Sequence, residues 1–254
     1  MALMSRADTR RMLVKLEEAY PDAKCALNFE NPFQLLVATM LSAQSTDVRV
    51  NMVTARLFAR YRGPEDFAEV SLEELGEQVR ELGLWRAKSQ NIIAMSRMLL
   101  TYYSGQVPTA QEDLVRLPGV GRKTANVVVS NAFATPALAV DTHVKRVCNR
   151  IGIANSMTPD IVEKQVCQRI PQKLWSQAHH WLIQHGRQVC SARNPKCETC
   201  PVSDVCKFYQ TTLQTEPRVR AKVFVEVGPP PKKRRSRGQG SGKRPTDKRY
   251  AQED

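Results

Sequence analysis

Four cysteines in the last quarter of the chain form a strong candidate for a metal site. Their spacing is Cys190-x6-Cys197-x2-Cys200-x5-Cys206, so four of the seven cysteines fall within one short segment. Closely spaced thiolates are good ligands for zinc and for iron–sulfur clusters. Zinc sites commonly use two Cys-x2-Cys pairs, and only one is present here. The spacing slightly favours a 4Fe–4S cluster, leaves zinc open, and has four buried thiols as its structural alternative.

A second segment, Leu117–Ala125, reads LPGVGRKTA and lies between two segments of helical pattern. It matches neither the GxxxxGK[ST] phosphate loop nor the GxGxxG dinucleotide loop. Gly119 and Gly121 allow the backbone to approach a phosphate closely, and the N–H groups that begin the next helix point toward such an anion. This pattern predicts a hairpin that grips the backbone of a nucleic acid without reading its sequence. An ordinary glycine-rich turn is the alternative.

Lys123 and Asp141 are the candidate catalytic residues. Lys123 falls in the first turn of the helix after the hairpin, where the helix dipole and the neighbouring Arg122 both disfavour its charge. A neutral amine is the form that attacks carbon. Asp141 follows an apolar pair and precedes a helix, so it is either an N-cap or a carboxylate at the edge of a cleft that works with Lys123. A phosphate-binding lysine is the alternative for Lys123.

The chain carries 38 Lys and Arg against 25 Asp and Glu, a net charge of +13. Residues 217–254 contribute twelve of the basic and four of the acidic residues, so most of the excess lies in this tail. A basic tail favours a polyanionic partner but carries no sequence information. No apolar stretch is long enough for a membrane span, and the first residues lack a secretory pattern. We therefore expect no membrane partner and reduced cysteines.

Apolar residues recur at helical spacing through most of the body, and few alternating strands are visible. The sequence therefore predicts an all-α fold. The expected helices begin after Thr9, at Asn31-Pro32, at Thr46-Asp47 and at Ser71 (ending near Gly83), and others run from Lys88 to Tyr103, on both sides of the hairpin, from Thr142 to about Ile151, from Pro159 to Arg169 and from Lys173 to Gln188. His179 and His180 lie on the last of these and are expected to pack and form hydrogen bonds.

The hairpin, the Val140–His143 stretch and the four-cysteine loop together resemble endonuclease III, a helix-hairpin-helix DNA glycosylase family. The segments Leu41–Asp47 and Gly83–Trp85 resemble it too. The resemblance covers roughly residues 5 to 210 and implies a two-lobed all-α fold with a bound 4Fe–4S cluster. It implies a six-helix barrel over residues 24–135, with the hairpin at about 113–133, and an iron–sulfur domain over 1–23 and 136–212. Residues 213–254 are then a basic tail, predicted to be disordered.

The resemblance also assigns roles to residues. Lys123 matches the family's nucleophile, Asp141 its catalytic carboxylate, Gln44 the residue that fills the gap left by the extruded base, and Leu84 a wedge in the opposite strand. The four cysteines match the cluster ligands. The remaining expected DNA contacts are Gly119, Gly121, Arg122, Arg193 and Lys196.

The implied activity is that of a bifunctional glycosylase and AP lyase of base excision repair. Such an enzyme excises oxidised pyrimidines from duplex DNA through a lysine Schiff base and cleaves the strand by β-elimination. We expect a monomer that acts on DNA with damaged pyrimidines or abasic sites. A bacterial source implies the cytoplasm; in a eukaryote, Pro229–Arg237 would serve as a nuclear signal. The alternatives are a monofunctional glycosylase, against which Lys123 argues, and a non-catalytic DNA-binding protein, against which the pair of Lys123 and Asp141 argues.

Overall fold

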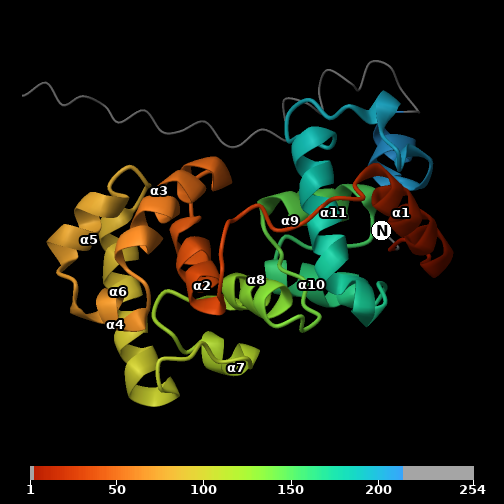
Figure 1. The fold of residues 1–254 in the computed structure, drawn as a ribbon. Coiled ribbons are helices and arrows are strands. Elements are labelled where there is room, and N and C mark those ends of the chain that lie inside the picture. Colours follow the sequence, from red (N-terminus) through yellow and green to blue (C-terminus); the bar gives the residue numbers. More distant parts are fainter. Residues whose placement is uncertain (1–2, 214–254) are drawn as a thin grey trace, which may run out of the picture.

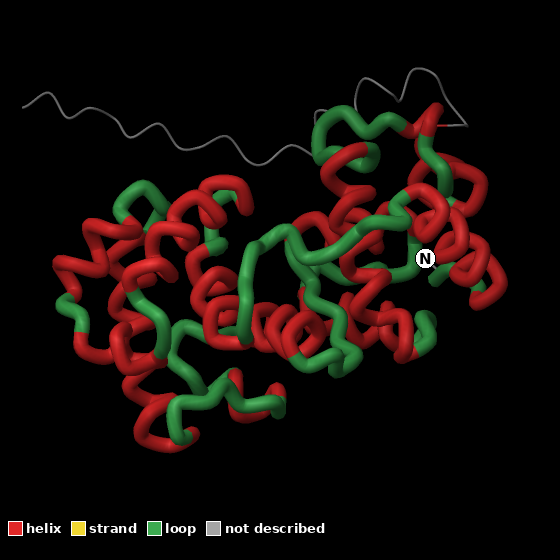
Figure 2. Tube along the Cα trace, in the orientation of Figure 1, coloured by secondary structure: helices red, strands yellow, loops and turns green. Residues whose placement is uncertain are grey.

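The computed structural model describes residues 3–213, and this part of the chain is helical, without a β-strand (Figures 1 and 2). The tail beyond residue 213, with its predicted disorder, lies outside the described residues. The α-helices are α1 (Arg6–Ala19), α2 (Pro32–Leu41), α3 (Asp47–Arg60), α4 (Pro64–Glu69), α5 (Leu72–Val79), α6 (Trp85–Tyr103), α7 (Gln111–Leu114), α8 (Arg122–Ala132), α9 (Thr142–Ile151), α10 (Pro159–Cys167) and α11 (Trp175–Gln188). Short 3-10 turns and a π-helical segment, Tyr209–Leu213, complete the described chain. The expected all-α fold is confirmed.

The helices form two lobes with separate apolar cores (Figure 1). The first core takes its buried side chains from α2 to α8, between Leu27 and Val129. The second core combines α1 with α9, α10, α11 and the cysteine-containing loops, so the two ends of the described chain meet there. The backbone N–H of Met4 donates to the carbonyl of Gly152 at 2.7 Å, which ties the N-terminal segment to this second lobe. The boundaries expected from the sequence, 24–135 and 136–212, stay a prediction.

Local sequence determines where five of the eleven α-helices in the described chain begin. Five N-cap side chains, those of Ser5, Asn31, Thr46, Ser71 and Asp141, each accept a hydrogen bond from the backbone N–H three residues later. Such a cap satisfies an N–H that has no partner within the helix and contributes about 1 kcal/mol. These caps fix the first turn of each helix, including the turn that carries Asp141.

Some helix boundaries differ from the expectation. The first helix begins at Arg6 because Ser5 caps it, and α6 begins at Trp85, three residues earlier than expected. The helix after Ser71 ends at Val79 rather than near Gly83. Helix α4 was not expected, since its six residues are too few to show a helical period. Within the described residues, no helix is long and apolar enough to cross a membrane.

A buried lysine lies beneath the loops that precede α3 and α6. Lys88 is only 6% exposed, and its Nζ donates a hydrogen bond to the Ser45 hydroxyl at 3.2 Å. Burial lowers the pKa of Lys88 from its ordinary 10.5 to about 8, because the charged form is poorly solvated there. The folded state therefore binds this proton less tightly than the unfolded chain does.

Replacing Lys88 should stabilise the protein in a pH-dependent way. Lys88→Met removes a poorly solvated charge, and we expect an increase of about 1 kcal/mol at pH 7, or roughly 2–4 °C in Tm. Between about pH 8 and 10.5 the wild-type lysine already loses its proton in the folded state, so the advantage should shrink across that window. The difference in stability between Lys88→Met and wild type is measured by thermal unfolding at pH 7 and at pH 10.5. Substitution of an exposed lysine, Lys173→Met, is the control. An advantage that is equal at both pH values would contradict this origin.

Candidate active site between the two lobes

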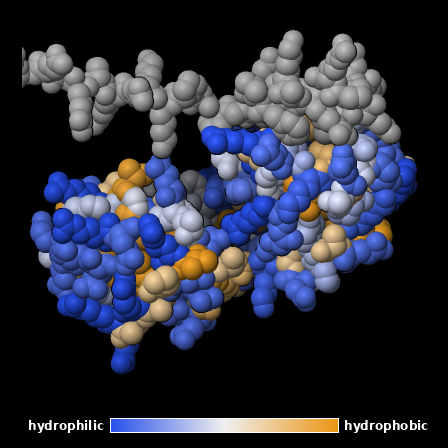
Figure 3. All heavy atoms as spheres, turned by 90° about the horizontal axis from the view of Figure 1, so that it is seen from above, coloured by the Kyte–Doolittle hydropathy of each residue, from blue (hydrophilic) through white to orange (hydrophobic). Residues whose placement is uncertain are grey.

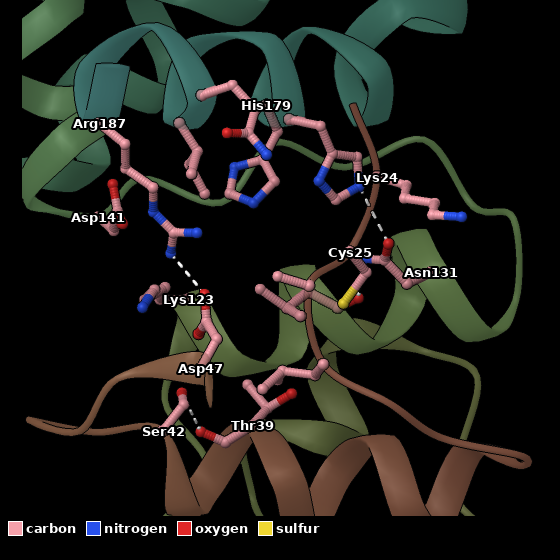
Figure 4. A pocket seen from close by; sticks show the side chains of 16 residues that line it. Lys24, Cys25, Thr39, Ser42, Asp47, Lys123, Asn131, Asp141, His179 and Arg187 are labelled. Atoms are coloured by element: carbon pink, nitrogen blue, oxygen red, sulfur yellow. Dashed lines mark hydrogen bonds and ion pairs between the residues drawn. The ribbon is translucent and has the colours of Figure 1, made fainter. Parts of the chain in front are cut away.

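A pocket opens between the two lobes, and it contains both candidate catalytic residues. The space-filling view shows a hollow between the lobes with hydrophilic residues around it (Figure 3). The pocket is lined from both sides, by Lys24, Cys25, Ala26, Leu27, Thr39, Ser42, Asp47, Lys123, Val127, Asn131, Asp141, His179, His180, Ile183, Gln184 and Arg187. Figure 4 shows Lys123, Asp141, Asp47 and Arg187 gathered along one side of it.

Lys123 and Asp141 stand at the starts of two helices that belong to different lobes. Lys123 is the second residue of α8, and its exposed side chain extends from the first turn. Asp141 is the N-cap of α9, and its Oδ1 accepts a hydrogen bond from the N–H of Val144 at 2.8 Å. The capping role and the cleft position, which the sequence offered as alternatives for Asp141, are therefore both realised. The helix dipole favours a carboxylate at this position.

Arg122 does not point its charge at Lys123. Its Nε and Nη2 donate to the two carboxylate oxygens of Glu163 on α10, at 2.9 and 2.8 Å. This two-point ion pair joins the lobe that contains α8 to the lobe that contains α10. The repulsion that Arg122 was expected to exert on Lys123 is therefore largely balanced by Glu163. The DNA-binding role expected for Arg122 stays a prediction.

A second ion pair crosses the pocket itself. Arg187 on α11 donates from Nη2 to Oδ2 of Asp47, the first residue of α3, at 2.6 Å (Figure 4). Arg187 could not be identified from the sequence, because its partner lies 140 residues away. Cys25 lies in the loop that leads to α2, and it also lines the pocket.

The hairpin contains two glycines that differ in their surroundings. Gly119 has φ +74°, and a Cβ there would come within 2.7 Å of the Asn91 side chain on α6, so packing and backbone conformation both require glycine. Gly121 has an ordinary φ of −93°, and a Cβ there would meet no protein atom within 4 Å. The protein's own packing does not require a glycine at 121, so an open backbone at the start of α8 is the remaining reason for it.

Gln44 and Leu84, the two expected inserting residues, share an unusual backbone conformation. Their φ values are 55° and 61°, in the left-handed region that residues other than glycine seldom adopt. Both side chains are exposed, that of Leu84 by 56%. Their loops are adjacent, since a Cβ at Gly83 would lie 3.7 Å from the Gln44 carbonyl. Strain of this kind persists where surrounding structure enforces it, and it is common at functional sites.

The four expected cluster ligands line one pocket, which also contains Arg150 and His185. Arg150 Nη1 donates toward Cys190 Sγ at 3.5 Å, and His185 Nε2 lies 3.7 Å from Cys200 Sγ while its Nδ1 lies 3.0 Å from the Tyr20 hydroxyl. N–H groups directed at sulfur suit thiolate ligands. Among residues 3–213 no three acidic, His or Cys side chains converge closely enough for a single metal ion.

This arrangement fits a cluster larger than one ion. All four sulfur-bearing side chains face a shared apolar space, and burial raises the pKa of Cys200 to about 12. A bound cationic group is what would keep such buried sulfurs as thiolates. Arg193 and Lys196 lie in the same loop, and their side chains are exposed.

Comparison with known proteins decides the family. A model of the HhH-GPD superfamily of base excision DNA repair proteins matches residues 37–172, and one for the iron-sulfur binding domain of endonuclease III matches residues 190–206. Endonuclease III from Bacillus subtilis is 48% identical over 77% of this chain and 90% of its own length. The enzyme from Escherichia coli K12 is 42% identical over 81% of this chain and 97% of its own. This chain belongs to the endonuclease III family.

Solved structures agree. A non-covalent endonuclease III–DNA complex and a trapped covalent endonuclease III–DNA intermediate each match with a TM-score of 0.79 and 46% identity, over 82% of this chain and 98% of theirs. As a member of the endonuclease III family, the protein is a base excision repair DNA glycosylase and AP lyase, and it carries a 4Fe–4S cluster. The resemblance inferred from the motifs, the activity and the choice of cluster over zinc are thereby confirmed.

The two hairpin glycines provide a matched pair of variants. Gly119→Ala should destabilise the fold by about 1–2 kcal/mol or more, because a left-handed φ is costly for alanine and Asn91 must move. The free energy of unfolding of Gly121→Ala should stay within about 1 kcal/mol of the wild-type value. The variant should nevertheless bind intact and damaged duplexes more weakly, by similar factors. Thermal unfolding and DNA binding at fixed salt measure both. Unchanged DNA affinity in Gly121→Ala would contradict a close backbone approach at this glycine.

Proposed function

We propose that Lys123 and Asp141 perform the glycosylase and lyase steps on a nucleotide that enters the pocket between the lobes. The observation that carries the proposal is that a lysine at the start of α8 and a carboxylate at the start of α9 line the same pocket. A base within a duplex is unreachable, so the nucleotide must leave the stack before these groups can act. Oxidised pyrimidines stack poorly, which lowers the cost of that step.

The Lys123 amine, in its neutral form, forms a bond to C1′ of the sugar as the bond from C1′ to the base breaks. The base departs with the electron pair and takes up a proton. Asp141 stabilises the positive charge that develops on the sugar and assists proton transfer. The sugar opens to a Schiff base with Lys123, loss of a 2′ proton expels the 3′ phosphate, and water finally releases the lysine.

The surrounding residues have supporting roles in this proposal. Gln44 and Leu84 enter the duplex from adjacent loops, and the backbone at Gly119 and Gly121 binds the phosphate backbone. Arg122, Arg193 and Lys196 add positive charge along the DNA. Arg122 does so only in part, because Glu163 already accepts two of its N–H groups.

Cys190, Cys197, Cys200 and Cys206 hold the cluster. Bound there, it supplies structural support for the loop that contains Arg193 and Lys196. We further propose that the enzyme acts as a monomer, since one chain supplies every residue of the pocket. The bacterial relatives support a place in the cytoplasm.

Lys123→Ala should abolish covalent trapping on abasic DNA by borohydride while binding of that DNA persists, because the trapped bond needs the amine. Asp141→Asn keeps an oxygen that can cap α9 but removes the charge, so single-turnover base release should slow by about 10²-fold or more. Both are measured on duplexes with one 5-hydroxyuracil or one abasic site. Wild-type trapping in Lys123→Ala would remove Lys123 from the mechanism, and wild-type turnover in Asp141→Asn would leave Asp141 as a cap alone.

A further inference from the structure

The turns that carry Gln44 and Leu84 meet at the first turn of α6. Ser45 closes the first of them, because its backbone N–H donates to the carbonyl of Ser42 at 3.0 Å. Beneath that turn, Lys88 Nζ donates to the Ser45 hydroxyl at 3.2 Å. The backbone N–H of Lys88 donates to the carbonyl of Leu84 at 3.0 Å. One residue of α6 is therefore bonded to both turns.

Both turns need support from their surroundings. Gln44 and Leu84 have left-handed φ values, and residues other than glycine keep such a conformation only where neighbouring structure enforces it. The Leu84 turn has an anchor close by, because Leu82 is fully buried in the first core. Residues 42–49 are exposed or half-buried throughout. Apolar packing therefore does little to hold the Gln44 turn, and its hydrogen bond to Lys88 ties it to α6 instead.

Lys88 is a costly residue for this position if packing is its only task. Its side chain is 6% exposed, and burial alone lowers its pKa to about 8, with no carboxylate nearby to offset the loss of water. A methionine would fill a similar volume without a charge. Residues that lower stability without contributing to packing are typical of functional positions.

We propose that Lys88 is a positioning residue that holds the Gln44 turn against the Leu84 turn, so that both side chains enter the duplex together. This inference rests on the proposed function, because it needs Gln44 and Leu84 to insert into DNA. Lys88 is buried, so it acts through Ser45 rather than on the DNA itself. Without its bond to Ser45, the Gln44 turn has more conformations to lose on insertion, and the inserted state becomes less favourable.

The bond between Lys88 and Ser45 can be removed from either end, and the two ends have opposite effects on stability. Lys88→Met removes a buried charge and should raise Tm by about 2–4 °C. Ser45→Ala leaves the ammonium buried without its acceptor and should lower Tm. Both variants should impair insertion to a similar extent. A loss of insertion that is shared by a stabilised and a destabilised variant cannot result from a loss of folding.

Two control variants keep the bond. Ser45→Thr retains a hydroxyl that can accept from Lys88. Ser89→Ala removes the hydroxyl of the residue next to Lys88, which is buried and has no hydrogen-bond partner among the described residues. Both should behave as wild type in DNA insertion, because neither removes the acceptor of Lys88 Nζ.

Insertion is measured on a duplex that carries a tetrahydrofuran abasic analogue, which cannot form a Schiff base, opposite 2-aminopurine. The fluorescence of 2-aminopurine rises when it leaves the base stack. At saturating holoenzyme this gain should fall about twofold or more in Lys88→Met and in Ser45→Ala. Single-turnover cleavage of a true abasic duplex should fall about tenfold, as expected for one hydrogen bond from a charged group. The double variant should lose no more than either single variant does.

The inference is overturned if Lys88→Met keeps the wild-type fluorescence gain, if Ser45→Ala alone is impaired, or if the double variant loses the sum of the two single effects. Gln44→Ala and Leu84→Ala test the proposed function separately. A wild-type gain in both of them would remove insertion by these residues from that function. A reduced gain in both, together with a wild-type gain in Lys88→Met, would overturn the role of Lys88 alone.

Discussion

The two candidate catalytic groups belong to different cores, so the active site exists only while the two lobes are held in register. Lys123 stands on α8 of the first lobe, and Asp141 caps α9 of the second. Two ion pairs span the boundary, Arg122 with Glu163 and Arg187 with Asp47. The Arg122 pair is joined at two points, and such a pair holds a defined geometry better than an exposed single contact does.

Neutral hydrogen bonds reinforce the same boundary. Asn126 on α8 donates to the carbonyl of Leu138 at 3.1 Å, and His180 on α11 bonds to Asn131 on α8. Helix α8 therefore has contacts with both cores along its length. The candidate nucleophile in its first turn, Lys123, is therefore held in place by both lobes at once. Positioning of this kind lowers the entropic cost of bringing reacting atoms together.

Much of this could be predicted from sequence, because caps and short motifs are local. Asp141 and the end of α9 follow from an N-cap and a glycine at the C-terminus, and the predicted span Thr142–Ile151 is confirmed. The wall of the pocket could not be predicted in the same way. Arg187 pairs with Asp47 over a sequence separation of 140 residues, and Glu163 pairs with Arg122 over a separation of 41 residues. No local pattern indicates such partners. From the sequence, His179 and Arg187 are therefore recognisable only as residues of an amphipathic helix.

The second lobe is assembled from both ends of the described chain, so it cannot fold completely until most of the chain has been synthesised. Helix α1 buries Met12, Leu13 and Leu16 against a core whose other members extend to Cys206. At about 5–20 residues per second, these partners emerge roughly 10–40 s after α1 does. During that interval the whole first core has already been synthesised, whereas the residues that α1 packs against are still incomplete. The N-terminal helix must therefore wait, with its apolar face uncovered, until the cysteine loop has been made.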